Sequence, residues 1–593
     1  MTASTPPALE VEDLSITCSG RLLVNSISLH VDRGESLAIV GESGSGKSLT
    51  ARAIAGLLPS GLESTGSIRV EGRAHAGTRS SGPRVGLLMQ DPFTMLNPTM
   101  TAGDHIAETL RAAGVSRGEI PGEVQRRLGE VGITDPAVAK RYPFELSGGM
   151  SQRVALASAL AIDPVILLAD EPTTALDTTT QADVLELLRS IQRDRGMSLV
   201  FITHDLRVAF DLCDRVLVMY AGTIMEQSPA AAMRDQPLHP YTIGLLSSIP
   251  STEGYQESLR GIPGSVPATH TVTDQCSFAA RCDHRIDACL ESAPALREVE
   301  PRRWAACIRI GNLSAADTPI RVHTPRVASE DARHTVLSVR DLSKSYRLAG
   351  SSHPALGGVS FDLRQGEALG IVGESGSGKT TIARCILGLT TPSSGTIDFA
   401  GVGDISGRPN AAQRRQRAQA VQCVFQDPYS TLNPMLSIGT TLAEALGQRD
   451  RPLTDRDGEV AALLERVGLP ASMAKRRPAS LSGGQRQRVA IARALAVEPR
   501  VLLCDEPVAA LDVSVQAQIL ELLRDVNHNE GTSLLFITHD LGVVRQVTES
   551  VLVLYRGAVV ETGPTDAVLD DPQDDYTRRL VAAMPSTQTR QEI

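Results

Sequence analysis

The sequence predicts an α/β fold that is built twice within one chain. The segment GESGSGKS at Gly41–Ser48 recurs as GESGSGKT at Gly373–Thr380, an offset of 332 residues. LSGGMSQR at Leu146–Arg153 recurs as LSGGQRQR at Leu481–Arg488, an offset of 335 residues. In both copies short apolar strands alternate with helical stretches, which is typical of a sheet covered by helices. We therefore expect a tandem duplication of one whole domain of roughly 250 residues.

This repeat divides the chain into four segments. The two copies occupy residues 1–250 and 334–593. Residues 251–310 contain four cysteines and the only tryptophan, Trp304, and we expect a small cysteine-containing domain there. Residues 311–333 are polar and lack hydrophobic periodicity, which predicts a linker. Each copy opens with alternating strand-like segments, so an antiparallel β subdomain and a helical subdomain should accompany each α/β core.

Composition excludes several classes of protein. The net charge of −10 argues against a general nucleic-acid binder, because phosphate contacts need clustered positive charge. No stretch approaches the ~20 apolar residues that cross a bilayer, and the N-terminus lacks the pattern of a secretory signal. We expect a soluble, cytosolic protein whose membrane role, if it has one, comes through partners. The nine cysteines of such a chain are not expected to form a disulfide framework.

The first repeated motif predicts a phosphate site in each copy. A strand (SLAIV or ALGIV) runs into Gly-x-x-x-x-Gly-Lys-Ser/Thr and then into a helix. Glycines let backbone N–H groups surround phosphate oxygens, and the helix N-terminus faces the same anion. Lys47 and Lys379 should reach the β- and γ-phosphates, while Ser48 and Thr380 hold Mg²⁺. The predicted binding residues are Gly41, Ser43, Gly44, Gly46, Lys47 and Ser48, and in the second copy Gly373, Ser375, Gly376, Gly378, Lys379 and Thr380. Two copies in the same context exclude a chance match of a glycine-rich turn.

A second element is an apolar strand that ends in two carboxylates, VILLADEP and VLLCDEP. Such a strand should deliver Asp170 and Asp505 to the metal. It should also place Glu171 and Glu506 beside the γ-phosphate, where a carboxylate orients the attacking water. A surface acidic pair is the alternative, but both copies lie at the same offset from the other motifs.

The two LSGG sequences resemble the signature of ATP-binding-cassette (ABC) proteins, and the remaining motifs follow in that family's order. The resemblance covers about 500 of the 593 residues. It implies two P-loop ABC ATPase domains with a RecA-like α/β core. It also implies three further pairs of functional residues: Gln90 and Gln426 in the glutamine loops, Asp177 and Asp512 in the D-loops, and His204 and His539 as switch histidines.

In this family two cassettes close head to tail around two ATP molecules. The resemblance implies that Lys47, Ser48, Gln90, Asp170, Glu171 and His204 face the second copy's signature residues Ser482, Gly483 and Gly484. The other site would combine Lys379, Thr380, Gln426, Asp505, Glu506 and His539 with Ser147, Gly148 and Gly149. Signature N–H groups at a helix N-terminus would complete the γ-phosphate shell only on closure. Because both copies retain glutamate and histidine, we expect two hydrolytically competent sites.

The copies also differ in two places. The family stacks adenine on an N-terminal aromatic residue, and Tyr346 fits this role, but the matching position in the first copy is Cys18. The residues before the signatures are Tyr142–Glu145 in one copy and Arg477–Ser480 in the other. Different membrane partners and neutral drift both remain open as reasons.

Finer features resemble the peptide and nickel importers. These are QDPFTMLNP and QDPYSTLNP after the glutamines, and HPYTIGLLSSIP and DDYTRRLVAAMP at the ends of the copies. The resemblance implies an ATPase that energises an oligopeptide or dipeptide importer from the cytoplasmic face of the bacterial plasma membrane. It implies two permease subunits and an extracytoplasmic binding protein as partners. Glutathione and nickel importers share these motifs and remain alternatives.

The cysteine-bearing segment suggests a metal site, because four thiols lie within 32 residues: Cys276, Cys282, Cys289 and Cys307. Their spacing lacks the short C-x-x-C pairs of most structural zinc sites. The segment resembles an extension of oligopeptide and dipeptide importer cassettes, and that resemblance favours a 4Fe-4S iron–sulfur cluster with a structural role. Zinc and unliganded thiols remain open.

A soluble twin-cassette factor acting on ribosomes or DNA is the rival from another class. Translation-factor cassettes use a charged helical arm between their domains, whereas residues 311–333 are short and not helical in pattern. Co-purification separates the two hypotheses: permeases support the importer, and ribosomal subunits support the rival.

Overall fold

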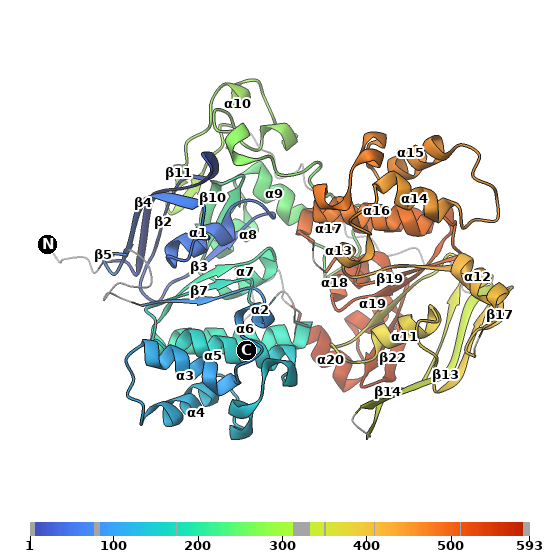
Figure 1. Ribbon diagram of the computed structural model, residues 1–593. Helices are drawn as coiled ribbons and strands as arrows, with labels where there is room; N and C mark the ends of the chain where they lie inside the picture. The colour runs from blue at the N-terminus through green and yellow to red at the C-terminus, as the bar shows by residue number, and fades with distance from the viewer. Residues whose placement is uncertain are drawn as a thin grey trace.

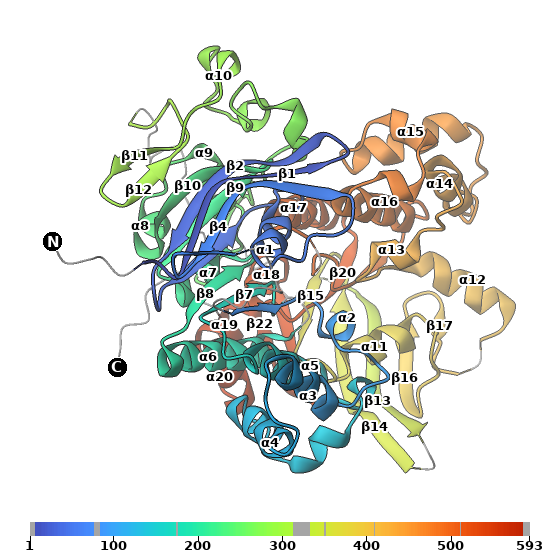
Figure 2. The same cartoon turned by 60° about the vertical axis from the view of Figure 1, so that its left-hand side comes forward.

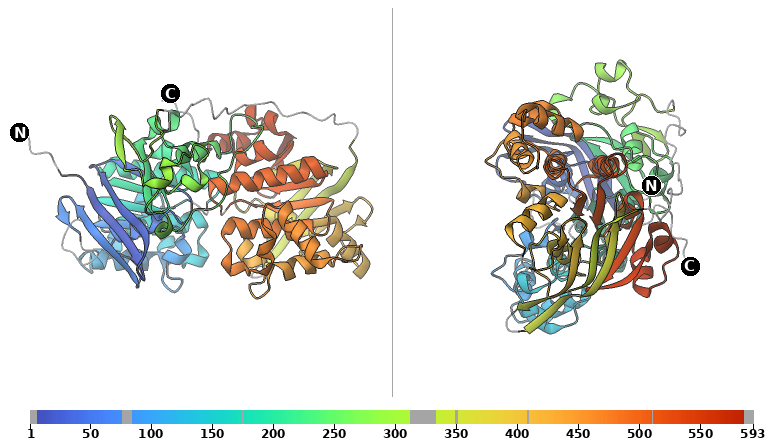
Figure 3. Two further views of the ribbon diagram at one scale, coloured as in Figure 1. Left: turned by 90° about the horizontal axis from the view of Figure 1, so that it is seen from above. Right: turned by 90° about the vertical axis from the view of Figure 1, so that its right-hand side faces the viewer.

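The computed structural model describes residues 6–75, 84–173, 176–311, 333–348, 351–407, 409–509 and 511–584. Two α/β units lie side by side, the first coloured blue to green and the second yellow to red (Figure 1). The view from above shows the same pairing (Figure 3). The predicted tandem α/β fold is confirmed. The predicted linker, residues 311–333, lies almost entirely outside the described residues.

The first cassette contains two sheets. An antiparallel sheet has the order β2 (Arg21–Val31), β1 (Leu9–Cys18), β4 (Leu62–Val70), β5 (Arg73–Ala74). The main sheet has a parallel part in the order β9 (Arg215–Tyr220), β3 (Ser36–Val40), β8 (Ser198–Ile202), β7 (Ile166–Asp170), β6 (Val85–Leu88). Its strands are apolar runs because helices cover both faces of a parallel sheet. β10 (Thr223–Pro229) pairs antiparallel with β9 at the edge.

The helices of the first cassette begin with α1 (Lys47–Ile54), which follows the glycine-rich loop directly. The helical subdomain comprises α2 (Pro92–Met95), α3 (Ala102–Ala112), α4 (Ile120–Glu130) and α5 (Gly148–Leu160). The chain then forms α6 (Thr178–Arg195), α7 (Leu206–Leu212), α8 (Ala230–Asp235) and α9 (Pro240–Ser247). Local signals fix several starts; for example, Thr101 and Asp104 form a capping box at α3.

The second cassette repeats this plan. Its antiparallel sheet has the order β14 (Ser351–Arg364), β13 (Thr335–Leu348), β16 (Ser394–Phe399), β17 (Gly403–Asp404). Its main sheet has the order β18 (Val421–Val424), β19 (Val501–Asp505), β20 (Ser533–Ile537), β15 (Ala368–Val372), β21 (Ser550–Tyr555), β22 (Ala558–Pro564). Its helices are α11 (Lys379–Ile386), α12 (Ala411–Ala420), α13 (Pro428–Thr431), α14 (Ile438–Leu446), α15 (Arg456–Arg466), α16 (Gly483–Leu495), α17 (Val513–Glu530), α18 (Leu541–Val547), α19 (Thr565–Asp570) and α20 (Asp575–Ala582).

Residues 251–310, which we call the extension, lie on the first cassette around α10 (Ala288–Glu291) (Figure 2). Their strands β11 (Arg297–Glu300) and β12 (Arg303–Ala305) continue the main sheet beyond β10, with Trp304 opposite Gln227. The extension is therefore joined to the first cassette by backbone hydrogen bonds as well as by side chains.

Part of the extension, residues 255–262, also crosses to the second cassette, and we call it the strap. Ile262 donates its N–H to Ser514 Oγ at the start of α17, at 2.9 Å. Leu259, only 3% exposed, belongs to the hydrophobic core of the second cassette. In this region the two cassettes share a buried contact rather than a solvated gap.

No helix among the described residues is long and apolar enough to cross a bilayer. All nine cysteines are free thiols in the structure. Cys213, Cys385, Cys423 and Cys504 are buried, and Cys18 is half-buried.

Candidate functional site

Each phosphate loop lies between the first core strand and the helix that follows it, as the motif predicts. The first loop residue, Gly41, has φ 147°, and a Cβ there would lie 2.1 Å from the carbonyl oxygen of Met219. Gly373 has φ 149° and the same 2.1 Å approach to Leu554. Only glycine can occupy these two positions, because any side chain would collide with a neighbouring strand.

The two loop lysines are buried and bonded to their own loops. Lys47 Nζ donates to the carbonyl oxygens of Gly41 at 2.7 Å and Glu42 at 3.0 Å. Lys379 makes the same two bonds in the second copy, at 2.7 and 2.8 Å. Burial lowers the pKa of both lysines, against the opposing effect of nearby carboxylates. The ammonium groups are thus held at the floor of each loop, where an anion would offset their desolvation.

The carboxylates at the strand ends lie where the sequence placed them. Ser48 Oγ donates to Asp170 Oδ1 at 3.0 Å, which joins the loop to the tip of β7. Burial raises the pKa of Asp170. Burial, followed by the charge of Glu506, raises the pKa of Asp505 to about 6. A bound cation would reverse both shifts, because it favours the ionised carboxylate.

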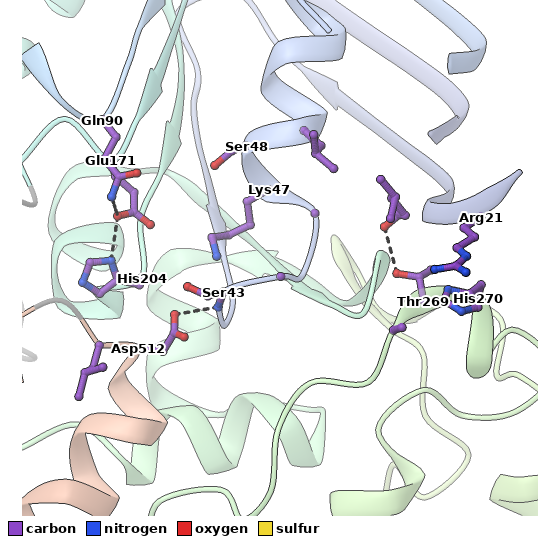
Figure 4. A pocket seen from close by; sticks show the side chains of 16 residues that line it. Arg21, Ser43, Lys47, Ser48, Gln90, Glu171, His204, Thr269, His270 and Asp512 are labelled. Carbon is purple, nitrogen blue, oxygen red and sulfur yellow. Dashed lines mark hydrogen bonds and ion pairs between the residues drawn. The ribbon is translucent and has the colours of Figure 1, made fainter. Parts of the chain in front are cut away.

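Glu171 and Glu506 each meet a glutamine and a histidine. Gln90 Nε2 donates to Glu171 Oε2 at 3.0 Å, and His204 Nδ1 lies 3.2 Å from the same oxygen (Figure 4). In the second copy Gln426 Nε2 donates to Glu506 at 2.9 Å, and His539 Nδ1 lies 3.2 Å away. The two triads join the same residue types, but the glutamine and histidine share one carboxylate oxygen in the first copy and contact different oxygens in the second.

Electrostatics couple each glutamate to its histidine. Burial opposes protonation of His204, but the carboxylate of Glu171 outweighs it and raises the histidine pKa. The same balance raises the pKa of His539 beside Glu506. Both glutamates also have left-handed backbones, with φ of 45° and 48°. Such backbone strain is typical of functional positions, because the surrounding structure must hold it.

Each pocket contains residues from both cassettes. The first pocket, of about 570 Å³, is lined by Ser43, Lys47, Ser48, Gln90, Glu171 and His204, and by Leu511 and Asp512 from the second cassette. The second, of about 470 Å³, is lined by Ser375, Gly376, Gly378, Lys379, Thr380, Gln426, Glu506 and His539, and by Leu176 and Asp177 from the first. Both volumes suit a small-molecule ligand.

Hydrogen bonds also join residues in or next to each D-loop to the opposite cassette. Ser43 donates its N–H to Asp512 Oδ1 at 2.8 Å. On the other side Thr178 Oγ1 donates to the carbonyl oxygen of His539 at 2.8 Å. Between the two sites, Arg207 and Asp540 form an ion pair at 3.1 Å.

The signature residues begin helices α5 and α16, but they do not line either pocket. Ser147 and Ser482 are the N-caps of these helices and accept backbone N–H groups three residues on. Close packing ties each signature to the helix after the D-loop: a Cβ at Gly149 would lie 2.6 Å from Thr180, and one at Gly484 would lie 2.3 Å from Val515. Signature and D-loop should therefore move together.

Two functional features were not visible in the sequence. The first is a tyrosine in each terminal motif: Tyr241 accepts the N–H of Glu42, and Tyr576 accepts that of Glu374, both at 2.9 Å. The second is Arg281 of the extension, whose guanidinium forms a bidentate pair with the carboxylate of Glu42 at 2.7 and 3.0 Å. Only the recurrence of the tyrosine in HPYT and DDYT could have signalled the first feature.

Tyr346 is the residue predicted to stack on the base in the second site. Tyr346, near the end of β13, lies under the ammonium of Lys344, 5.2 Å from its ring centroid. It is not among the residues that line the second pocket. Cys18 does not line the first pocket either; Arg21, Ala268, Thr269 and His270 are found there instead.

The four extension cysteines lie close together in the fold. Cys276 donates its N–H to the carbonyl oxygen of Cys289 at 2.9 Å, and Arg309 donates its N–H to Cys307 Sγ at 3.3 Å. Burial, with the neighbouring thiols, raises the pKa of Cys282 to about 11. Among the described residues, no three or more histidine, cysteine or acidic side chains are arranged to hold a metal ion.

Fold, loops and crossed pockets together define a pair of nucleotide-binding cassettes. The family model for "ABC transporter" matches residues 24–174 and 356–509, and the model for "Oligopeptide/dipeptide transporter, C-terminal region" matches residues 225–289 and 560–593. The chain belongs to the ABC transporter family as an ATP-binding subunit with two cassettes, and it is an ATPase.

Full-length relatives match nearly the whole chain. The oligopeptide transport ATP-binding protein OppD of Mycobacterium tuberculosis is 42% identical over 98% of both chains. The glutathione import ATP-binding protein GsiA of Escherichia coli is 39% identical over 95% of this chain and 86% of its own length. A structure of cbiO1 from Clostridium perfringens, part of the ABC transporter complex cbiONQ, is 29% identical and covers 40% of this chain and 91% of its own, with a TM-score of 0.36.

Proposed function

We propose that this chain is the ATP-hydrolysing subunit of an importer for oligopeptides or dipeptides. It would dock on two permease subunits at the cytoplasmic face of the bacterial plasma membrane and serve an extracytoplasmic binding protein. The match of both terminal regions to the oligopeptide/dipeptide model carries this proposal. Each pocket is lined by the D-loop of the other cassette, and this supports an intramolecular pair of cassettes that work together.

The geometry supports a role for each group of residues at the two sites. Lys47 and Lys379 would bind β- and γ-phosphate oxygens, since they lie buried at the loops. Ser48 with Asp170, and Thr380 with Asp505, would hold Mg²⁺, which would neutralise phosphate charge. Glu171 and Glu506 would orient water, positioned by their glutamine and histidine neighbours.

Closure of the two cassettes would bring the signature residues to the nucleotide. Ser147–Gly149 and Ser482–Gly484 would reach the opposite γ-phosphate when the helical subdomains rotate inward. Helix N-terminal N–H groups stabilise such an anion, so ATP would favour the closed form. Both sites keep every group needed for hydrolysis, and we propose that both hydrolyse ATP.

Permease docking would use surfaces near the glutamine loops. A groove of about 920 Å³ lies beside Gln426 and is lined by Gln422, Phe425, Arg414 and Arg415. On the first cassette, Tyr142 and Phe144 are stacked with centroids 5.5 Å apart, and Phe144 is 72% exposed. An exposed aromatic pair in one copy alone supports two different permease contacts, because such residues are enriched in interfaces.

Reconstitution tests the importer proposal. The complex of this chain with the permeases encoded beside it should show ATPase activity that rises when peptide-loaded binding protein is added. Stimulation by glutathione or nickel alone would assign another cargo. Purification with ribosomal subunits and without permeases would contradict the proposal.

We further propose that the extension carries a 4Fe-4S cluster on Cys276, Cys282, Cys289 and Cys307. Four cysteines are a suitable set of ligands, because thiolates bind such clusters. The proximity of the four cysteines and the N–H of Arg309 on Cys307 Sγ also support it. When bound, the cluster would brace a segment with little hydrophobic core of its own. The cysteine side chains would have to turn toward a common centre.

Metal analysis tests the cluster. Protein purified without air should contain iron and sulfide and absorb visible light. Cys276→Ser and Cys307→Ser should lose both, whereas the control Cys213→Ser should not. Zinc in place of iron, or no metal at all, would overturn the proposal.

A further inference from the structure

The two ends of the first pocket are built from different parts of the chain. Figure 4 shows Gln90, Glu171 and His204 at one end, Lys47 and Ser48 in the middle, and Arg21, Thr269 and His270 at the other. Because phosphates would occupy the middle, a nucleotide bound there would direct its ribose and base toward the end formed by Arg21 and His270.

The extension is held at this end by specific contacts. Thr269 is only 6% exposed, and its Oγ1 donates to the carbonyl oxygen of Leu23 in β2 at 3.0 Å. Gly222 makes this close approach possible: it has φ 75°, and a Cβ there would lie 2.5 Å from Leu23 O and 2.8 Å from Thr269 Oγ1. The short 3-10 turn Thr269–Thr271 therefore sits against β2, which places His270 at the pocket rim.

Arg21 reaches the same rim from the other side. It begins β2 and pairs with Cys18, the residue at the position where the second cassette has Tyr346. The guanidinium and the imidazole are both planar groups, and both stack on nucleobases. The first site thus contains base-stacking groups although it lacks an aromatic residue on β1.

We propose that Arg21 and His270 form the base-binding platform of the first ATP site, with the extension supplying one wall of that site. Among the described residues, the second pocket is lined by the two cassettes alone, and Ala355 lies where Leu23 lies in the first. The two sites bind the same phosphates in the same way and hold the base differently.

Nucleotide binding to the full chain tests this platform. Lys379→Ala is used throughout to remove binding at the second site. Arg21→Ala combined with His270→Ala should weaken ATP binding about 5- to 30-fold, the loss expected for one stacked base. Affinity for ribose 5′-triphosphate, which has the phosphates without a base, should stay the same. His270→Phe should retain ATP affinity, since it keeps a stacking surface.

A matched control and a second readout complete the test. His353→Ala alters the residue that pairs with Tyr346 between β13 and β14, and it should leave ATP binding at the first site unchanged. Photolabelling with 8-azido-ATP should modify a peptide that contains Arg21 or His270. Equal loss of affinity for ATP and ribose triphosphate would overturn the proposal, because the contact would then be with phosphate. Unchanged ATP affinity in the double variant, or labelling confined to other peptides, would overturn it as well.

Discussion

Replacing Arg281 with methionine should destabilise the first cassette strongly. The side chains of Arg281 and Glu42 are only 5% and 4% exposed, and they form a bidentate pair. The guanidinium also donates to the carbonyl oxygens of Ile262 and Pro263, at 3.1 and 2.6 Å. Methionine fills a similar volume but leaves Glu42 as a buried charge without a partner. Removing one member of a buried pair costs about 3–5 kcal/mol.

Trp304 provides a local probe for this loss, because it is the only tryptophan and lies in β12, beside β10. Its fluorescence in a urea titration should report unfolding of the extension and the adjoining sheet. For a slope of about 2–3 kcal/mol per M, the transition should shift by about 1–2 M toward lower urea. The control Arg297→Met changes an exposed arginine of the same extension and should shift it little.

A double variant decides whether the pair is the cause. Arg281→Met with Glu42→Leu removes both charges, so it should recover most of the stability that Arg281→Met loses. Additive losses in the two single variants would refute the reasoning, because they would show no coupling between the residues. An Arg281→Met transition that coincides with that of Arg297→Met would refute it directly.

Three further outcomes follow from the same structure. Burial and Glu506 raise the pKa of Asp505 to about 6, above its unfolded value, so the folded protein loses stability as pH rises from about 4 through 6 and this carboxyl ionises. In thermal unfolding, Asp505→Asn should therefore stabilise the nucleotide-free protein by about 3 kcal/mol at about pH 8 and little at about pH 4. Glu171→Gln and Glu506→Gln should reduce steady-state ATPase activity to the same extent, because each glutamate contacts one glutamine and one histidine; unequal losses would show inequivalent sites. Gly261→Ala should lower the thermal midpoint, since its Cβ would lie 2.5 Å from a carbonyl oxygen of α17, whereas Gly129→Ala, with open space around it, should not.

Sequence patterns predicted those parts of the molecule that repeat or that obey a period. The strands SLAIV and ALGIV appear as β3 and β15, because strands buried on both faces read as continuous apolar runs. The motifs also predicted where Lys47, Lys379 and the strand-end carboxylates lie in the fold, because each motif consists of elements that are consecutive in the chain.

Contacts between distant segments could not be predicted in this way. Arg281 and Glu42 are 239 residues apart, and neither stands out in its own surroundings. His270 lies in a stretch without periodicity, and it reaches the nucleotide pocket only because Thr269 and Gly222 pack closely against β2. Such contacts depend on how the completed elements meet, a relation that no local pattern encodes.

The strap lies between the D-loop of the second cassette and the phosphate loop of the first. Ile262 bonds to Ser514, and Asp512, two residues earlier, accepts the N–H of Ser43 in the first phosphate loop. Arg281 connects the strap to that same loop, because its guanidinium donates to the carbonyl oxygen of Ile262 and to the carboxylate of Glu42. The D-loop of the second cassette is thus joined to the first phosphate loop both directly and through the extension. If the signature helices rotate inward when ATP binds, we expect them to rotate about this contact, which lies beside the first site.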